Sequence, residues 1–374
     1  MGSVDVSILK LFKKINMISF YSKLIAPFMI SNNYPSLDES LRKLNVLDKD
    51  NGKTSLKLNK LVNSEYDLQI IVPVYNSEKT IKDCLYSILN QKTQYSFLLK
   101  CIDDGSTDNT PTILDNISKS FSNVSVVHQK NRGYSGARNT GLEKIYSKYI
   151  MFIDSDDKLE EHAIERLLDT AFNNDADIVE GSFRCYCEGK LKFKVQHTNK
   201  HTNNPFRTLY GYPWGKVYRA SLFRNVVYPE NYWFEDTVMM YRVWPKCKVV
   251  STLSNFVYYY RDNFNGITHQ SKGKLKTIDT LWVTQRLLED VEISNKSLLN
   301  YSDIYDFTLR QFITNTIRLS SLDDTVLKDS FVVNSYLVRK FFRDMKTQNI
   351  HLEKLERSLR TNNYKDFLIS VFTY

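Results

Sequence analysis

Residues 68–76 have the sequence LQIIVPVYN, an apolar run that ends in Tyr75 and Asn76. A short apolar run bounded by turn-forming residues predicts a buried strand over 68–74. Three further apolar runs follow, at 97–102, 124–128 and 149–153. Helical periodicity alternates with the runs, at 78–90, 108–121, 136–146 and 160–173. This repeated βα pattern predicts an α/β domain, Rossmann-like, with a mostly parallel central sheet and ligands beyond the carboxyl ends of its strands.

Composition places the chain among globular proteins with anionic partners. Its 374 residues are 42% hydrophobic, enough for one large domain with appendages or two moderate ones. The net charge of +9 favours nucleotide diphosphates or anionic lipids. Lys and Arg are spread along the chain without a nucleic-acid-binding signature, so nucleic acid is not an expected partner. Five cysteines without a CxxC pair argue against disulfides and structural zinc, and they favour a reducing, cytoplasmic location.

The two ends of the chain differ from the middle. Residues 8–30 mix lysines with Leu, Ile, Phe and Met at helical spacing, which is typical of a helix on an anionic membrane surface or of one docked on the protein itself. Lys23 and Pro27 interrupt its apolar stretch, so no membrane span is expected. Residues 31–65 are polar and predict a linker. Beyond residue 270, helical periodicity predicts a helical region, at 275–291, 305–319 and 330–345.

Acidic residues follow two of the predicted strands. After the second strand come residues 103–108, DDGSTD, where Asp104 can accept hydrogen bonds from a nucleoside and Asp108 can cap a helix. An ordinary turn explains Asp108 better, whereas a ligand contact is the preferred role for Asp104. Residues 154–157, DSDD, put three carboxylates in four positions, and their repulsion favours a bound cation. Carboxylate oxygens suit Mg²⁺ or Mn²⁺, although a DxD pattern is informative only because it follows a buried strand.

A glycine-containing loop lies between the third and fourth strands. Residues 131–141, NRGYSGARNTG, open a predicted helix, whose positive end and Arg138 can hold phosphate. The alternative is a loop whose glycines only allow close packing.

The order of these motifs is similar to that of a known family. VPVYN, DDGSTD, NRGYSGARNTG and YIMFIDSDD, followed by YPWGKVYR (212–219) and WFEDTVMM (233–240), resemble glycosyltransferase family 2, whose members have the GT-A fold and use nucleotide sugars. The resemblance covers residues 66–270. It implies three parts: an N-terminal helix and linker (1–65), a GT-A domain (66–270) and a helical C-terminal region (271–374).

The resemblance also implies roles for individual residues. It assigns the nucleoside to Pro73, Tyr75 and Asp104. Asp154 and Asp156 would lie at the ribose, metal and diphosphate, with Asp156 as the direct metal ligand.

Three further positions complete the implied site. Arg138 would contact the donor, and Glu235 and Asp236 match the acidic pair near the acceptor, with Asp236 as the general base. Inversion by single displacement needs such a carboxylate on the acceptor side, opposite the metal-bound diphosphate. The alternative for Glu235 and Asp236 is a solvated helix start with favourable acidic residues.

Residues 258–270, YYYRDNFNGITHQ, resemble more loosely the family segment that closes over the diphosphate. Arg261 and His269 are its candidate phosphate contacts, although Gly266 stands where the family more often has Ser. Trp214 could stack on a sugar, but core packing is the simpler interpretation.

The sequence therefore predicts an inverting, metal-dependent glycosyltransferase. The expected donor is a nucleotide sugar, with UDP as the preferred nucleotide, and the expected acceptor is a glycan, a lipid-linked sugar or a polymer in cell-surface polysaccharide or glycoconjugate synthesis. The alternative is an inactive nucleotide-sugar-binding scaffold of the same fold. A dinucleotide-dependent oxidoreductase is disfavoured, because no GxGxxG turn follows the first strand. The sugar and the acceptor depend on pocket shape and are not identified by these motifs.

Overall fold

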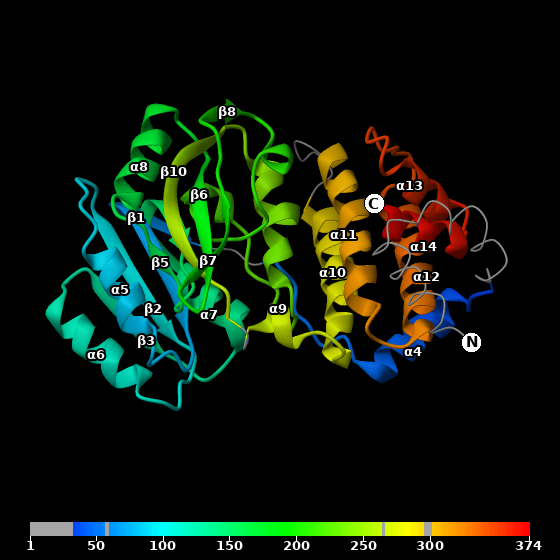
Figure 1. The fold of residues 1–374 in the computed structure, drawn as a ribbon, viewed down its shortest axis with the longest axis horizontal. Coiled ribbons are helices and arrows are strands. Elements are labelled where there is room, and N and C mark those ends of the chain that lie inside the picture. Colours follow the sequence, from blue (N-terminus) through cyan, green and yellow to red (C-terminus); the bar gives the residue numbers. More distant parts are fainter. Residues whose placement is uncertain (1–32, 57–59, 264–265, 295–300) are drawn as a thin grey trace. The chain divides into compact units, whose positions relative to one another are not determined.

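The computed structural model describes residues 33–56, 60–263, 266–294 and 301–374 (Figure 1). The chain forms two compact units. Residues 52–231 and 235–266 form the first, here called the sheet unit. The second, the helical unit, contains residues 33–51 of the described chain, residues 232–234 and residues 267–374. The basic segment 8–30 lies outside the described residues.

The sheet unit is built on one sheet of ten strands. Its strands are β1 (Lys60–Val74), β2 (Phe97–Asp103), β3 (Val124–His128), β4 (Lys144–Phe152), β5 (Lys158–Leu159), β6 (Ile178–Cys187), β7 (Lys190–Val195), β8 (Lys200–Thr202), β9 (Lys216–Arg219) and β10 (Val250–Arg261). Their order is β3-β2-β1-β4-β9-β6-β10-β5, with β7 beside β6 and β8 beside β10. The first four strands in this order are mutually parallel, as are β6 and β10. The predicted α/β fold with a parallel core is confirmed.

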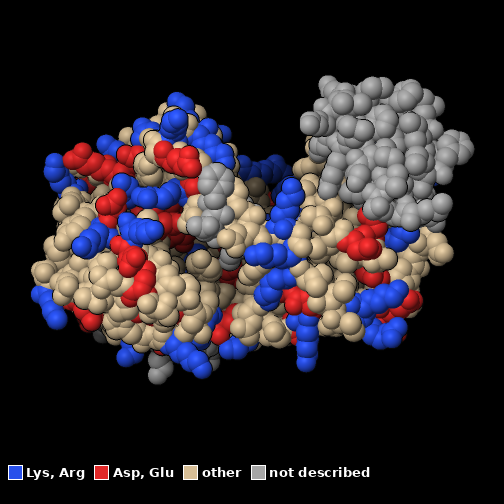
Figure 2. Space-filling model, turned by 60° about the horizontal axis from the view of Figure 1, so that its bottom comes forward, with Lys and Arg blue, Asp and Glu red and all other residues tan. Residues whose placement is uncertain are grey.

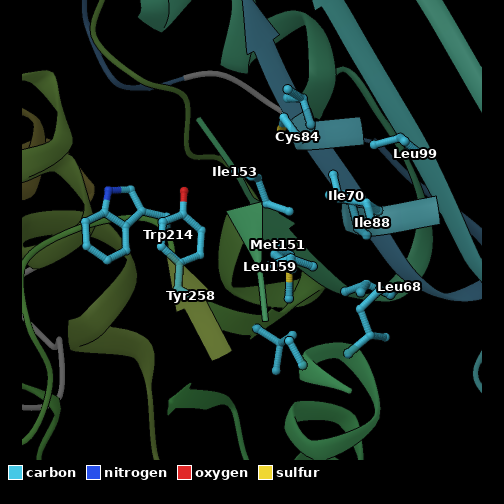
Figure 3. Close-up of a cluster of buried hydrophobic side chains, with 14 of the residues drawn as sticks. Leu68, Ile70, Cys84, Ile88, Leu99, Met151, Ile153, Leu159, Trp214 and Tyr258 are labelled. Carbon is cyan, nitrogen blue, oxygen red and sulfur yellow. The ribbon is translucent and has the colours of Figure 1, made fainter. Parts of the chain in front are cut away.

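Helices cover both faces of the parallel part of the sheet. Alternate residues of β1, Leu68, Ile70 and Val72, belong to a buried cluster that also contains residues of α5 (Ile81–Leu89), α6 (Thr110–Ser120) and α8 (Ala163–Asn173). Figure 3 shows part of this cluster, with the aliphatic side chains apart from Trp214 and Tyr258.

Helix α7 (Gly133–Leu142) lies on the opposite face of β1. A Cβ at Gly141 would come within 2.4 Å of the Ile71 side chain, so glycine allows this helix to approach the strand closely. The helix predicted over 136–146 therefore ends earlier than expected, because β4 begins at Lys144.

The strand order creates one functionally important position. Strand β1 lies between β2 and β4. The connection from β1 to β2 runs through α5 on one face of the sheet, whereas α7, which leads into β4, lies on the opposite face. In open α/β sheets such a switch point opens a crevice where ligands bind. Here the strand ends that meet at it carry Tyr75 after β1 and Asp154 after β4.

Helices make up the C-terminal part of the helical unit: α9 (Ile267–Gln270), α10 (Asp279–Ser294), α11 (Tyr301–Leu319), α12 (Asp324–Phe341), α13 (Glu353–Arg360) and α14 (Tyr364–Thr373). Of these, α10, α11 and α12 overlap the segments that helical periodicity predicts, whereas α9, α13 and α14 were not predicted individually. Buried polar groups pair within it: Asn315 Oδ1 accepts a hydrogen bond from Thr280 Oγ1 at 2.5 Å, and Asn315 Nδ2 donates to the Thr280 carbonyl at 3.0 Å.

Residues 31–65 are not the simple linker that their polarity predicts. Helix α4 (Leu37–Leu47) forms there, with Ser36 accepting a capping hydrogen bond from the Glu39 amide at 3.3 Å. Leu44 is fully buried, and α4 packs against α12, so this helix is part of the helical unit. Only a few apolar residues face the partner helix, which explains why hydrophobic content alone failed to predict it.

Short turns complete the fold: η1 (Pro205–Arg207), η2 (Ala220–Phe223), η5 (Trp244–Lys246) and η6 (Leu275–Ile278). In the described part of the chain, no helix has both the length and the apolar character to cross a membrane. Figure 2 shows basic and acidic side chains interspersed over much of one face, in line with the spread of Lys and Arg along the sequence.

Candidate active site

Asp104 lies at the carboxyl end of β2 and is buried, with 3% of its surface exposed. Its Oδ1 accepts hydrogen bonds from Gln129 Nε2 at 2.7 Å and from the Arg132 amide at 2.8 Å. Both bonds use Oδ1, so Oδ2 is the atom through which Asp104 would contact a nucleoside. The turn that follows Asp104 depends on Gly105, whose φ is +76° and whose Cβ, if present, would lie 3.0 Å from the Asn131 amide nitrogen.

The two other predicted nucleoside contacts lie at the carboxyl end of β1: Pro73 is within the strand and Tyr75 follows it. Pro73 is buried, whereas Tyr75 is 47% exposed in the loop at the carboxyl end of the strand. Asn76, with φ +47°, turns the chain after them. Its Oδ1 accepts a hydrogen bond from the Thr107 amide at 2.8 Å, which ties the loops after β1 and β2 together.

His128 was not predicted as part of this region. Its Nδ1 lies 2.7 Å from Asp103 Oδ2, and its Nε2 lies 3.1 Å from Asp115 Oδ1. The hydrogen bond with Asp103 raises the pKa of His128 above its ordinary value. Asp103 Oδ1 accepts from the Ser106 amide at 3.0 Å, so His128 supports the DDGS turn. The sequence did contain a signal for this contact, because β3 ends in His128 and the neighbouring strand β2 ends in Asp103.

The DSDD loop after β4 divides into different roles. Asp157 is fully buried and accepts hydrogen bonds from the Tyr258 hydroxyl at 2.7 Å and the Arg261 amide at 2.6 Å. Burial, with the charges of Asp156 and Asp154, raises its pKa well above the ordinary value. The same Tyr258 hydroxyl accepts from the Asp154 amide at 3.2 Å. Asp157 and Tyr258, neither of which was predicted as a site residue, therefore fix the shape of the loop.

Asp154 and Asp156 are the more exposed carboxylates of this loop. Burial and the charge of Asp154 raise the pKa of Asp156, and Asn263 Nδ2 donates a hydrogen bond to Asp156 Oδ2 at 3.2 Å. Among the described residues, no group of three or more His, Cys, Asp or Glu side chains is arranged to hold a metal ion. A cation here would thus have two protein carboxylates and would need further oxygen ligands from elsewhere.

Arg138, on α7, joins two acidic sites. Only 5% of its surface is exposed. One terminal nitrogen lies 3.1 Å from Asp154 Oδ1, and the other lies 2.7 Å from Glu235 Oε1. The Tyr228 ring centroid is 5.3 Å from the guanidinium carbon. Burial lowers the pKa of Arg138, but the charges of Asp154 and Glu235 outweigh it and keep that pKa above its ordinary value.

Glu235 and Asp236 lie in η3 (Glu235–Thr237), followed by the π-turn η4 (Met239–Val243). The preceding Phe234 has a φ of +65°, and strained backbone of this kind clusters at functional sites. Glu235 is 8% exposed; burial raises its pKa, and Arg138 opposes that shift. Asp236 is the more exposed of the two. The pair thus separates into a carboxylate held by Arg138 and one that reaches the surface.

A second ionic cluster holds α7 in place and was missed in the sequence. Glu230 is 7% exposed and accepts from Lys53 Nζ at 2.7 Å, from Asn139 Nδ2 at 3.3 Å and from Arg132. Asn139 also donates to the Tyr228 carbonyl at 2.8 Å. These contacts attach the helix that carries Arg138 to residues 228–230, which lead to the acidic pair.

The remaining predicted residues divide between the two units. Arg261 lies in the sheet unit, where its amide binds Asp157. His269 is an exposed residue of α9 in the helical unit, whereas all the other predicted site residues lie in the sheet unit. Trp214 is 3% exposed, which agrees with the core-packing interpretation.

Residues 69–228 match the family described as Glycosyl transferase family 2. The domain belongs to glycosyltransferase family 2. Its strand-end motifs, up to Asp157, lie within the matched region of this glycosyltransferase domain, whereas Glu235 and Asp236 lie just beyond it.

Several relatives carry the same domain. The chain is 31% identical over 216 residues to "Uncharacterized glycosyltransferase EpsJ" of Bacillus subtilis, covering 54% of this chain and 62% of that protein. It is 31% identical over 211 residues to "Glycosyltransferase GlyA" of Streptococcus pneumoniae (52% and 30%). It is 32% identical over 203 residues to "Poly(ribitol-phosphate) beta-glucosyltransferase" of Bacillus spizizenii (52% and 32%). The chain thus spans less than two thirds of each of these relatives.

A solved structure supports the fold. S. aureus TarS 1–349 in complex with UDP-GlcNAc superposes with a TM-score of 0.64 at 19% identity, covering 81% of this chain and 89% of that one. This likeness confirms the GT-A architecture of the glycosyltransferase domain.

The bridge through Arg138 leads to a stability prediction. Replacing Arg138 by Met leaves Asp154 and Glu235 without their shared cation in a mostly buried setting, and removing one partner of a buried ionic pair costs about 3 kcal/mol or more. Lys92→Met is the control, since both side chains of the Lys92–Glu161 ion pair are exposed, at 73% and 67%, and its loss should change the stability much less. Urea unfolding of both variants measures the difference. Equal losses would show that the Arg138 bridge does not stabilise the domain.

Proposed function

We propose that this chain is an inverting glycosyltransferase that moves a sugar from a UDP-sugar to a hydroxyl of a glycan, lipid-linked or polymer acceptor, in cell-surface polysaccharide or glycoconjugate synthesis. The observation that carries the proposal is the pair of ionic contacts made by Arg138, which link Asp154 of the DSD loop to Glu235. Asp236 is the next residue after Glu235, so it lies near the same loop. A donor-side acidic loop and an acceptor-side carboxylate are the two parts that a single displacement requires.

The donor assignment has independent support. The TarS structure that shares this fold was solved with UDP-GlcNAc, and a relative is named as a poly(ribitol-phosphate) beta-glucosyltransferase. In this chain Asp104 and Tyr75 would bind the nucleoside, and the buried Pro73 would form part of the surface against which the nucleoside packs. Within the sheet unit, Arg261 is the candidate for a contact with the diphosphate, and Arg138 would act on the donor through Asp154.

Asp236 is the proposed general base. It would take the proton of the acceptor hydroxyl while that oxygen attacks the anomeric carbon from the face opposite the diphosphate, which leaves as UDP. Glu235 is less suited to this step because Arg138 already holds its carboxylate at 2.7 Å. Its proposed part is to position Asp236 and to keep Arg138 in place.

Asp154 and Asp156 fit a divalent cation, Mg²⁺ or Mn²⁺. Burial and the neighbouring Asp154 charge raise the pKa of Asp156, so a cation would relieve a repulsion that Asn263 offsets only in part. Mg²⁺ is commonly held by one or two carboxylates together with substrate phosphates, which matches a loop with two available carboxylates. When bound, the ion would stabilise the charge on the leaving diphosphate.

A donor-hydrolysis panel tests the reaction. Purified full-length protein with Mn²⁺ or Mg²⁺ should hydrolyse one UDP-sugar faster than the others. Asp236→Asn should lower that rate by roughly 10²–10⁴-fold, the usual contribution of a general base, with UDP affinity unchanged. Proton NMR of the sugar released at early times should show the anomeric configuration inverted relative to the donor.

Two results would contradict this proposal. A retained anomeric configuration would exclude the single displacement and the role of Asp236. Tight UDP-sugar binding without turnover of any donor would favour the alternative, an inactive scaffold of the same fold.

The metal assignment predicts a separate loss. Asp156→Asn should lower donor hydrolysis by at least about 100-fold, because the ion supplies several kcal/mol of transition-state stabilisation. Asp83→Asn, at a carboxylate that is 60% exposed on α5, is the control and should be active. Wild-type hydrolysis should stop in excess chelator and return with Mn²⁺ or Mg²⁺. Full activity in chelator would rule out the metal.

Membrane association is the last part of the proposal. Residues 8–30 would place the enzyme on the cytoplasmic membrane face, with each lysine contributing on the order of 1 kcal/mol against an anionic surface. The full-length protein should sediment with phosphatidylserine vesicles at low salt and be released at high salt. A chain lacking residues 1–30 should stay in solution while it still hydrolyses the donor. Binding that survives this deletion would assign the contact to another surface.

A further inference from the structure

Trp214 is the middle of a stack of aromatic rings. Its ring centroid lies 4.5 Å from that of Tyr212 and 4.5 Å from that of Tyr258, with interplanar angles of 7° and 5°. Trp214 and Tyr258 are buried, and Figure 3 shows them at one side of the apolar cluster. Tyr212, by contrast, is 39% exposed. The stack therefore begins in the core and ends at the surface with Tyr212.

Two more exposed rings, Phe193 and Tyr210, contact the buried ring of Phe183, which Tyr212 also contacts. Phe183 is 1% exposed, and its ring meets Phe193, Tyr210 and Tyr212 edge-on, at 6.4, 5.6 and 6.1 Å between centroids. Phe193 is 41% exposed and Tyr210 is 45% exposed. These three residues, Phe193, Tyr210 and Tyr212, are here called the aromatic strip. Three large rings grouped on a surface mark an interaction site more often than rings scattered singly.

Buried charges hold the backbone of the strip. Lys216 Nζ lies 2.6 Å from Glu180 Oε1 and donates to the Tyr212 carbonyl at 2.8 Å, while Glu180 Oε2 accepts from the Tyr210 amide at 3.0 Å. Lys216 and Glu180 are almost completely buried. A buried ion pair contributes little net stability compared with apolar packing. Its main effect here is to fix the backbone positions of Tyr210 and Tyr212.

The stack connects the strip to the DSDD loop of the candidate active site. At the inner end, the Tyr258 hydroxyl binds Asp157 and the Asp154 amide in the DSDD loop. At the outer end, burial raises the pKa of Tyr212, and the next largest cause is the charge of Asp236. The exposed rings thus extend outward from the stack whose inner end holds the DSDD loop.

The chemistry of the strip matches a carbohydrate chain. Tyr and Phe present flat apolar faces, and Tyr adds a polar hydroxyl at its edge. A sugar ring offers C–H groups on its faces and hydroxyls around its rim, which pairs with such surfaces. Three exposed rings offer three such faces, which consecutive sugars of a chain can contact one by one.

We propose that Phe193, Tyr210 and Tyr212 bind successive sugar rings of the acceptor, so that the acceptor of this enzyme is an oligosaccharide or polysaccharide chain rather than a single sugar. This assignment rests on the proposed glycosyltransferase function. It adds an acceptor-binding surface distinct from the nucleotide site.

A glycan array supplies the test. Full-length wild-type protein and the triple variant F193A/Y210A/Y212A are applied to immobilised oligosaccharides and polysaccharides. The wild type should bind glycans of several sugars, and the triple variant should lose this signal by at least tenfold. Tyr86→Ala is the matched control, because Tyr86 is also a solvent-exposed ring of the sheet unit, 44% exposed on α5, and its removal should leave the signal unchanged.

UDP affinity, thermal unfolding and size-exclusion chromatography of the same proteins separate the outcomes. Equal UDP affinity and similar melting temperatures in wild type and triple variant would show that the loss belongs to the strip. Failure of both proteins to bind UDP would instead count against the proposed function. Equal glycan signals for wild type and triple variant, including none for either, would overturn the acceptor surface. So would a change of oligomeric state in the triple variant, which would assign the strip to contacts between copies of this chain.

Discussion

The buried guanidinium of Arg138 is the interaction on which the active site depends. It stands between the Asp154 carboxylate at the end of β4 and the Glu235 carboxylate at the start of η3. Without a cation at this position, acidic groups from two distant segments would repel one another in a region with little water. With it, the DSDD loop and the Glu235–Asp236 pair are held in a fixed relation. The surrounding contacts, from Glu230 to Asn139 on α7, serve to keep Arg138 there.

Sheet topology places that guanidinium. Because β1 lies between β2 and β4, the loops after β1 and β4 meet at a switch point. Helix α7 follows β3 and therefore begins at the same carboxyl edge of the sheet. Gly141 allows α7 to approach β1 closely enough for Arg138 to reach Asp154. The position of the proposed donor site is thus a consequence of strand order, helix packing and one small residue, while the side chains at the strand ends provide its functional groups.

The acidic loop also shows how apolar packing and charge are combined. Tyr258 takes part in the aromatic stack with Trp214 and uses its hydroxyl to hold both Asp157 and the Asp154 backbone. Asp157 is therefore fixed as part of the core, which leaves Asp154 and Asp156 at the surface of the loop. The same stack carries Tyr212 outward, so one set of packed rings supports the donor loop and presents the aromatic strip.

The sequence by itself determined the βα order and the motifs at the strand ends, because apolar periodicity and turn residues are local signals. It also named Asp154, Asp156, Arg138, Glu235 and Asp236 through their resemblance to family 2. Only the tertiary structure decided how they are connected: Arg138 bridges two carboxylates, Asp157 is buried, and His269 belongs to the helical unit. Only the structure showed that residues 37–47 form helix α4. It also showed that Tyr212 is exposed while Trp214 is buried. Burial and ion pairing arise between segments far apart in the chain, and no local pattern records which side chain meets which.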